Sequence, residues 1–426
     1  MPVFDRFGEE NNMTTFTRDD ALALDKQDKL AGFRDRFQLE EGLIYLDGNS
    51  LGPLPKATME RMQSAIAVEW GQDLITSWNK HGWMDLPRSL GNKIAPLVGA
   101  EQDQVVVGDS TSVNVFKLLA AGLKMNPGRK VILSDPGNFP TDLYMIQGLR
   151  EFLGDDQVEM RLADETEVVD AVDENTAVVL LTQVNFRSGR MYDMKAVTEA
   201  VQAKGALMVW DLCHSAGAVP VDLAGCNADM AVGCSYKYLN GGPGAPAFLY
   251  VAPRHQDKVV QPLSGWHGHA HPFTFDLGYT PSNTVSRYLC GTPSVLSMRA
   301  LEVALDMWSE VDMQMVREKS IKLCDMFIDL VESRCAGHGF ELASPRDASQ
   351  RGSQVSFGHE EGYAIVQALI ADKVVGDFRA PNIMRFGFTP LYTSYVDVWD
   401  AVDRLVRIMD GKVYDQPEFK VRAAVT

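Results

Sequence analysis

The sequence predicts an α/β protein with a large domain on a mostly parallel sheet, followed by a smaller α+β domain. Two observations support this prediction. Between about residues 100 and 251, short apolar runs alternate with longer segments whose apolar residues have helical spacing. After Pro293 the pattern changes to long helical segments with few strands.

The apolar runs of the first part are typical of strands buried on both faces of a sheet. They cover residues 104–107, 130–133, 177–184, 206–210, 230–234 and 248–251. Helices are expected at 111–123, 141–153 and 194–204. Ligands of open α/β sheets bind beyond the carboxyl ends of the strands, so we expect the chemistry in the loops that follow these runs.

The chain after Pro293 predicts a long helix over 295–334 that is interrupted near Val311, strands at 354–357 and 383–388, and a helix at 395–409. We therefore expect three parts. They are an N-terminal segment (1–60) that packs on the small domain, a large domain (61–293) and a small C-terminal domain (294–426).

Composition and charge exclude several classes of protein. With 40 Lys and Arg against 57 Asp and Glu, the net charge of −17 disfavours nucleic acid and anionic membranes as partners. No stretch approaches the roughly 18 apolar residues of a membrane span, and the acidic start lacks the features of a signal peptide. The six cysteines form no CxxC pair, which favours reduced thiols. We expect a soluble, cytoplasmic protein.

Lys237 gives the strongest local signal. It follows a predicted buried strand and precedes the glycine-rich turn at 240–244. Burial there is expected to lower its pKa and make the amine nucleophilic, as a lysine that forms a Schiff base requires. The alternative is a surface lysine that begins a turn.

Asp211 closes an apolar run upstream of Lys237. A buried carboxylate is costly unless it is paired, and the protonated nitrogen of a pyridine cofactor would be such a partner. His214 could lie over or beside the ring. The alternative is that Asp211 caps a helix. The occurrence of Asp211 and His214 together upstream of Lys237 favours a bound pyridine cofactor over a helix cap.

Two further segments could complete a cofactor site. Thr111 and Ser112 stand between a strand and a helix, where amide groups and the helix dipole favour an anion such as phosphate. Phe139 precedes a helix that begins with proline, where it could stack on a planar ring. The alternatives are ordinary helix caps and a hydrophobic staple.

Arg385 lies in an apolar predicted strand, where a guanidinium needs a carboxylate partner from a substrate or from the chain itself. The alternating histidines His267, His269 and His271 have no nearby acidic or cysteine ligand, so we expect no metal site.

Taken in order, these motifs resemble the fold-type-I pyridoxal-phosphate enzymes of the class-V aminotransferase superfamily, and specifically the kynureninase family. The resemblance extends from residue 45 to slightly beyond Arg385. Its most specific pieces are DGNSLGPLP (47–55), FPTD (139–142), DLCHSAG (211–217), CSYKYLNGGPG (234–244) and GWHGH (265–269). Tyr236 directly before Lys237 is distinctive, because cysteine desulfurases typically carry His there. The resemblance implies a seven-stranded sheet.

The resemblance also implies a role for each matching residue. Lys237 would carry pyridoxal 5′-phosphate covalently, Asp211 would pair with its ring nitrogen, and Tyr236 is the candidate acid–base group. The other implied cofactor contacts are Thr111, Ser112 and Tyr236 at the phosphate, Phe139, Asp142 and His214 at the ring, Thr182 at the ring hydroxyl, and Trp266 and Thr292 from the neighbouring subunit of a homodimer. The substrate would be bound by Arg385, which grips its α-carboxylate, and by Asn49 and Ser50.

The implied activity is hydrolysis of the Cβ–Cγ bond of L-kynurenine to anthranilate and L-alanine, in tryptophan catabolism and NAD biosynthesis by the kynurenine pathway. Thr292 stands where some family members carry Asn, so 3-hydroxykynurenine stays open as a substrate. The alternatives are an aminotransferase or desulfurase-type reaction, or a non-catalytic binding protein. The presence of Lys237, Asp211 and Arg385 together argues against the last, because buried charges without use would be costly.

Overall fold

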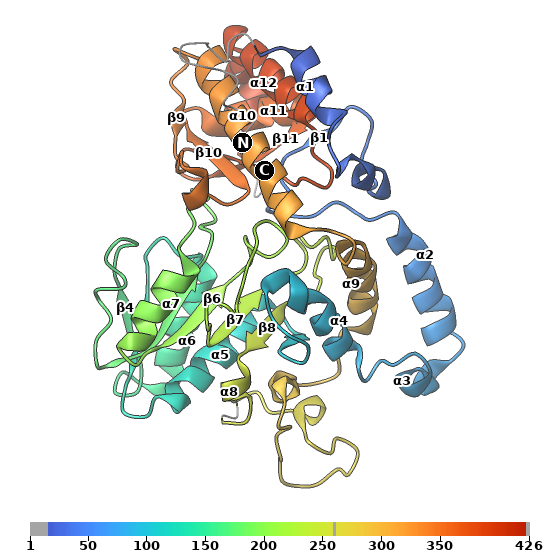
Figure 1. Ribbon diagram of the computed structural model, residues 1–426, viewed down its shortest axis with the longest axis vertical. Helices are drawn as coiled ribbons and strands as arrows, with labels where there is room; N and C mark the ends of the chain where they lie inside the picture. Colours follow the sequence, from blue (N-terminus) through green and yellow to red (C-terminus); the bar gives the residue numbers. More distant parts are fainter. Residues whose placement is uncertain (1–15, 259–260, 423–426) are drawn as a thin grey trace. The chain divides into compact units, whose positions relative to one another are not determined.

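The computed structural model describes residues 16–258 and 261–422, which form two compact units (Figure 1). Unit 2 consists of Leu51–Phe186 and Met191–Met313. Unit 1 consists of Arg187–Arg190 and the described parts of Met1–Ser50 and Gln314–Thr426. Residues 1–15 of the predicted N-terminal segment lie outside the described residues.

A seven-stranded sheet forms the centre of unit 2, in the order β2-β8-β7-β6-β5-β3-β4. Its strands are β2 (Val105–Val107), β3 (Val131–Ser134), β4 (Glu159–Leu162), β5 (Thr176–Thr182), β6 (Leu207–Asp211), β7 (Met230–Gly233) and β8 (Phe248–Val251). Strands β4, β3, β5, β6 and β7 pair in parallel, whereas β8 is antiparallel to both β7 and β2. The predicted mostly parallel α/β sheet is therefore confirmed.

Helices of unit 2 pack on this sheet and on each other. They are α2 (Ala57–Ser64), α3 (Ser77–Lys80), α4 (Leu86–Ile94), α5 (Thr111–Met125), α6 (Pro140–Leu153), α7 (Met194–Ala203), α8 (Pro253–Gln256) and α9 (Val295–Trp308). Helix α5 contacts β5 and β7, and its Leu118 and Leu119 are fully buried. Helix α9 contacts α2 and α4 and so belongs to unit 2, whereas the sequence places it at the start of the small domain.

Unit 1 has the α+β architecture expected for the small domain. Its four-stranded sheet has the order β12-β13-β10-β9, and a second sheet pairs β1 with β11. The strands are β1 (Ile44–Tyr45), β9 (Glu341–Leu342), β10 (Gln354–Gly358), β11 (Val374–Val375), β12 (Asp377–Arg379) and β13 (Ile383–Gly387), and the helices are α1 (Arg18–Asp25), α10 (Met313–Arg334), α11 (Gly362–Ala371) and α12 (Tyr395–Asp410). Among the residues that the structure describes, no helix is long and apolar enough to span a membrane.

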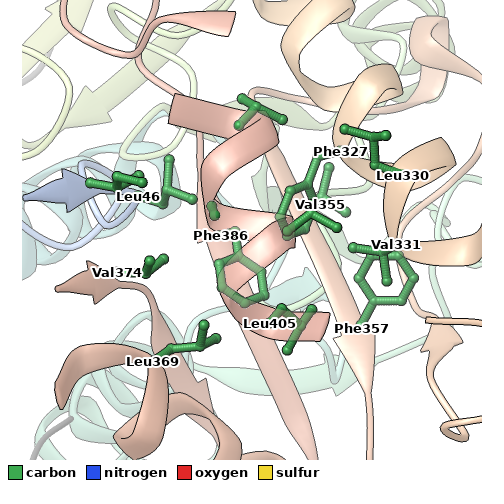
Figure 2. Close-up of a cluster of buried hydrophobic side chains, with 14 of the residues drawn as sticks. Leu46, Phe327, Leu330, Val331, Val355, Phe357, Leu369, Val374, Phe386 and Leu405 are labelled. Atoms are coloured by element: carbon green, nitrogen blue, oxygen red, sulfur yellow. The ribbon is translucent and has the colours of Figure 1, made fainter. Parts of the chain in front are cut away.

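The core of unit 1 joins side chains from both ends of the chain (Figure 2). Phe386 on β13 lies with its ring centroid 4.9 Å from that of Phe327 on α10. Leu46, directly after β1, is fully buried in the same cluster as Leu405 of α12. The N-terminal strand and the C-terminal helix therefore share one core.

Candidate active site

The carboxyl ends of β5, β6 and β7 meet at one edge of the sheet in unit 2. The register pairs Thr182, the last residue of β5, with Asp211, the last residue of β6. Lys237 follows β7 in the next loop. Parallel strands thus bring together three side chains that are far apart in the sequence.

A cavity of about 140 Å³ lies at this edge. An apolar cavity of roughly 150 Å³ accepts benzene, so this one has the size for a single substituted ring. Its lining includes nine of the predicted residues, Thr111, Ser112, Phe139, Asp142, Thr182, Asp211, His214, Tyr236 and Lys237. The sequence did not single out the other four, Ser110, Thr141, Phe186 and Cys213.

The Lys237 amine lies among polar and aromatic groups. Its Nζ is 3.1 Å from Nε2 of His214 and 5.9 Å from the ring centroid of Phe139. Burial lowers the pKa of Lys237, but its acidic neighbours, the thiols of Cys234 and Cys213 foremost, raise it, and the pKa lies above the ordinary value. The expected lowered pKa is therefore wrong, because burial is only one of the influences on this amine.

Two buried carboxyl groups, Asp211 and Asp142, line the cavity together. Asp211 accepts a hydrogen bond from the backbone N–H of Cys213 at 2.7 Å, and the Thr182 hydroxyl lies 3.5 Å from its other oxygen. Burial, and then the charge of Asp211, raise the pKa of Asp142 well above its ordinary value. Both effects favour the protonated form of Asp142.

Helix α5 begins at the cavity with hydroxyl side chains. Ser110 is its N-cap and accepts a hydrogen bond from the Val113 N–H at 3.4 Å. Thr111 and Ser112 are its first two residues, and the first N–H groups of a helix have no acceptor within the helix. Together with the positive end of the helix dipole, these free N–H groups are suited to binding an anion such as phosphate.

The donor set at this cavity fits pyridoxal phosphate. Lys237 supplies an amine, Asp211 a carboxylate for the ring nitrogen, and the start of α5 a phosphate site. Phe139 exposes 40% of its surface and is held edge-to-face against Phe186, with ring centroids 5.3 Å apart, so one aromatic face is available for a planar ring.

Arg385, Asn49 and Ser50, the predicted substrate-binding residues, belong to unit 1. Arg385 is buried; its Nε donates to Asp377 Oδ1 at 2.7 Å and its Nη2 donates to Ser50 Oγ at 2.7 Å. Arg379 also pairs with Asp377, at 2.7 Å. The internal ion pair that the sequence left open for Arg385 is present, and its binding of a substrate carboxylate stays a prediction.

Asp47 adds a second carboxyl group to this cluster of unit 1. Burial, and then the charge of Asp377, raise the pKa of Asp47 to about 7, although Ser50, Arg385 and Arg379 act to lower it. Asp47 is therefore half protonated near neutral pH, in a cluster that holds two arginines.

Trp266 and Thr292 belong to unit 2 but do not line the cavity. Trp266 stacks on His267, with ring centroids 5.0 Å apart, and meets Trp78 edge-on at 5.5 Å. Thr292 is exposed. Their expected contact with the phosphate of a neighbouring subunit stays a prediction.

Phe186 is the lining residue that a stricter use of the sequence could have found. It follows the end of β5 by only four residues, so the rule that ligands bind beyond the carboxyl ends of strands, which applies to Lys237, also covers it. The other three, Ser110, Thr141 and Cys213, adjoin residues that the sequence did identify.

Comparisons with known proteins connect this site to two families. The model of the kynureninase C-terminal domain matches residues 316–405, and that of the DegT/DnrJ/EryC1/StrS aminotransferase family matches residues 73–232. A kynureninase from Burkholderia mallei (strain SAVP1) is 54% identical, over 96% of this chain and 100% of that protein. A kynureninase from Pseudomonas fluorescens is 53% identical over the same shares.

Solved structures share the fold at low identity. The apo cysteine desulfurase from Thermococcus onnurineus NA1 superimposes with a TM-score of 0.76 at 17% identity, over 89% of this chain and 98% of that one. A C-DES mutant with glycine covalently linked to its PLP cofactor gives a TM-score of 0.75 at 16% identity, over 88% and 98%.

Proposed function

Because the chain belongs to the kynureninase family, we propose that it hydrolyses the Cβ–Cγ bond of L-kynurenine to anthranilate and L-alanine, with pyridoxal phosphate bound at Lys237. The observation that carries this proposal is that Lys237, Tyr236 and Asp211 line one ring-sized cavity beside the start of α5. The chain is therefore an enzyme that acts on a carbon–carbon bond.

Pyridoxal phosphate, when bound, supplies an electron-poor ring that weakens bonds at the carbons next to the substrate's amine. Asp211 would pair with the protonated ring nitrogen, and the raised pKa of the neighbouring Asp142 favours a neutral carboxyl group beside it. Phe139 would pack on the ring, and Thr182 would hydrogen-bond its hydroxyl group. Thr111 and Ser112 at the start of α5, together with Tyr236, would hold the phosphate.

Lys237 and Tyr236 are the residues that transfer protons to and from the substrate. Lys237, placed by His214 at 3.1 Å, takes the proton from the substrate's α-carbon. Burial raises the pKa of Tyr236 to about 12, so its hydroxyl is protonated and can donate to the γ-carbonyl oxygen while water adds to that carbon. The Cβ–Cγ bond then breaks, the γ-carbon leaves as the carboxylate of anthranilate, and the β-carbon takes a proton.

Arg385 recognises the α-carboxylate of the substrate, together with Asn49 and Ser50. The buried ion pair with Asp377 supports this role because it holds the plane of the guanidinium. A guanidinium fixed in a desolvated position binds a carboxylate more strongly than a mobile, hydrated one.

We also propose that the enzyme is a homodimer in which Trp266 and Thr292 reach the neighbouring subunit's phosphate. Unit 2 exposes apolar side chains that a monomer would leave in water, among them Ile75 at 76% and Phe275 at 81%. Replacing Leu277, which is fully exposed, by Asp should shift the protein toward monomer in analytical ultracentrifugation. A monomeric wild-type protein would contradict this proposal.

The same proposal places the reaction in tryptophan catabolism by the kynurenine pathway. We place the enzyme in the cytoplasm, a compartment in which cysteines like the six free ones of this chain stay reduced.

The first test combines a spectrum with a fluorescence assay. The purified protein should show the visible absorption band of lysine-bound cofactor, and L-kynurenine without a keto acid should yield anthranilate fluorescence. Lys237→Ala should abolish both signals. A band without cleavage of kynurenine or 3-hydroxykynurenine would refute the proposed reaction and favour the transaminase or desulfurase-type alternatives.

Tyr236→Phe tests the acid role separately. Loss of a general acid slows turnover by about 10²–10⁴-fold, so the variant should be slow but keep its cofactor band. If the band is lost instead, Tyr236 is a binding residue and the assigned proton transfer is wrong.

A further inference from the structure

Lys117 is a charged side chain in the interior of unit 2. It lies on α5, and its side chain is only 1% exposed. Its Nζ donates to Asp109 Oδ2 at 2.5 Å and to the backbone oxygen of Tyr288 at 2.6 Å. A buried ammonium is unfavourable without such partners, and nothing in the catalytic steps above uses this one.

Asp109 has an unusual backbone conformation directly before the start of α5. Its φ of 53° lies in the left-handed region, which residues other than glycine adopt only when their surroundings hold them there. Its backbone oxygen accepts from the Ala247 N–H at 2.9 Å, and the N–H of Gly108 donates to the Ala247 oxygen at 2.8 Å. Lys117 adds an ionic contact to the side chain.

This turn decides where the phosphate-binding groups point. Ser110, Thr111 and Ser112 follow Asp109 without a break and line the cavity. A change in φ at Asp109 would rotate the N–H groups and hydroxyls of these residues together. The Lys117–Asp109 ion pair therefore fixes the direction in which the backbone enters α5.

We propose that the Lys117–Asp109 ion pair is a positioning device for the cofactor's phosphate, because it holds the turn that presents the start of α5. The proposal rests on the proposed function, in which Thr111 and Ser112 bind that phosphate. Neither Lys117 nor Asp109 touches the cofactor in this role. Their effect is confined to the phosphate end and leaves the ring end unchanged.

A geometric role and a purely electrostatic role of the ion pair predict opposite effects of Asp109 substitutions on phosphate binding. If the pair acted only through charge, Asp109→Ala and Asp109→Asn would both leave the Lys117 ammonium unpaired and would both strengthen phosphate binding. If it acts through geometry, Asp109→Ala loses both the contact and the tolerance for a left-handed φ. Asp109→Asn keeps an acceptor oxygen and that tolerance, so it should rescue the turn.

The test compares the affinities of the full-length protein, freed of cofactor, for pyridoxal phosphate and for pyridoxal, which lacks the phosphate. Binding is followed by tryptophan fluorescence. The Kd for pyridoxal divided by the Kd for pyridoxal phosphate reports how much the phosphate contributes to binding. Lys117→Met and Asp109→Ala should reduce this ratio by about tenfold, whereas Asp109→Asn should stay within about threefold of wild type. The Kd for pyridoxal should change little in all three.

Two further variants control the test. Asp28→Ala removes the partner of another buried lysine, Lys319 in unit 1, with which it pairs at 2.7 Å, and should leave the ratio unchanged. Ser112→Ala removes a proposed phosphate contact and should reduce the ratio. If Lys117→Met fails to fold, the comparison of Asp109→Ala with Asp109→Asn decides alone.

The outcomes separate this inference from the proposed function. Equal losses for pyridoxal phosphate and pyridoxal would show a general structural role and overturn the inference, as would tighter binding by both Asp109 variants. If Ser112→Ala reduces the ratio but Lys117→Met and Asp109→Ala do not, only the inference fails. If Ser112→Ala has no effect either, the proposed phosphate site itself is wrong.

Discussion

Replacing Asp47 by Asn should change how the stability of the protein depends on pH. Burial, and then the charge of Asp377, raise the pKa of Asp47 from 3.8 to about 7, while Ser50, Arg385 and Arg379 oppose the shift. The folded state therefore keeps a proton that the unfolded chain has released between these two pH values. The contribution of Asp47 to the free energy of unfolding is therefore greatest below about pH 4 and is lost as the pH rises through 7.

The size of the effect follows from the shift. One pKa unit corresponds to about 1.4 kcal/mol, so a shift of about three units lowers the free energy of unfolding by at most about 4 kcal/mol at pH 8. Asn cannot ionise and removes this loss. The stability of Asp47→Asn relative to wild type should therefore increase from pH 5 to pH 8. The pKa of Asp142 is also raised, but it affects the free energy of unfolding of both proteins equally and cancels from their difference.

Urea unfolding followed by circular dichroism at pH 5, 6, 7 and 8 measures this difference. The exposed residue Asp257, replaced by Asn, is the control for removing one carboxylate. Parallel pH profiles for wild type and Asp47→Asn would refute the raised pKa. Parallel profiles would mean that Asp47 is charged at all four pH values, as expected if the arginines outweighed burial.

Two further predictions test the core and the lysine loop. Phe386→Ala removes a buried ring packed at 4.9 Å from Phe327 and should lower the free energy of unfolding by about 3–5 kcal/mol, measured in urea; a loss below about 1 kcal/mol would contradict the packing. Gly52→Ala would place a Cβ against the Lys237 carbonyl oxygen, beside the hydrogen bond from Gly52 N–H to the Tyr236 oxygen at 2.9 Å. Because the backbone must shift to admit this Cβ, the substitution should lower both kcat and the free energy of unfolding in urea, and wild-type kcat would show that the loop does not need this close approach.

Most of the sheet could be predicted because strands buried on both faces appear as apolar runs. All seven residues of β5 are buried, and the corresponding run is plain in the sequence. Strand β4 was missed because it lies at the edge of the sheet and is half-exposed, with a mixed sequence. The unit to which α9 belongs depends on its contacts with α2 and α4, which helical spacing does not report.

The cavity could be predicted to the extent that it follows the strand ends. Thr182 and Asp211 are the last residues of their strands and Lys237 lies in the loop after β7, and strand ends are a local property of the sequence. The pKa of Lys237 could not be predicted, because it sums the effects of groups from several loops. Asp377 was not foreseen as the partner of Arg385 because the pairing requires the register of β12 against β13.

The pairing of β1 with β11 has a consequence for synthesis on the ribosome. Ile44 pairs with Val374, and the N–H of Leu46 donates to the Val375 oxygen at 2.7 Å. At roughly 5–20 residues per second, translation reaches Val374 on the order of a quarter of a minute to a minute after Ile44. During that interval Leu46 lacks the strand partner and the later side chains that complete its core. A nascent chain that stops short of Val374 therefore cannot pair β1 with β11 or complete the core around Leu46.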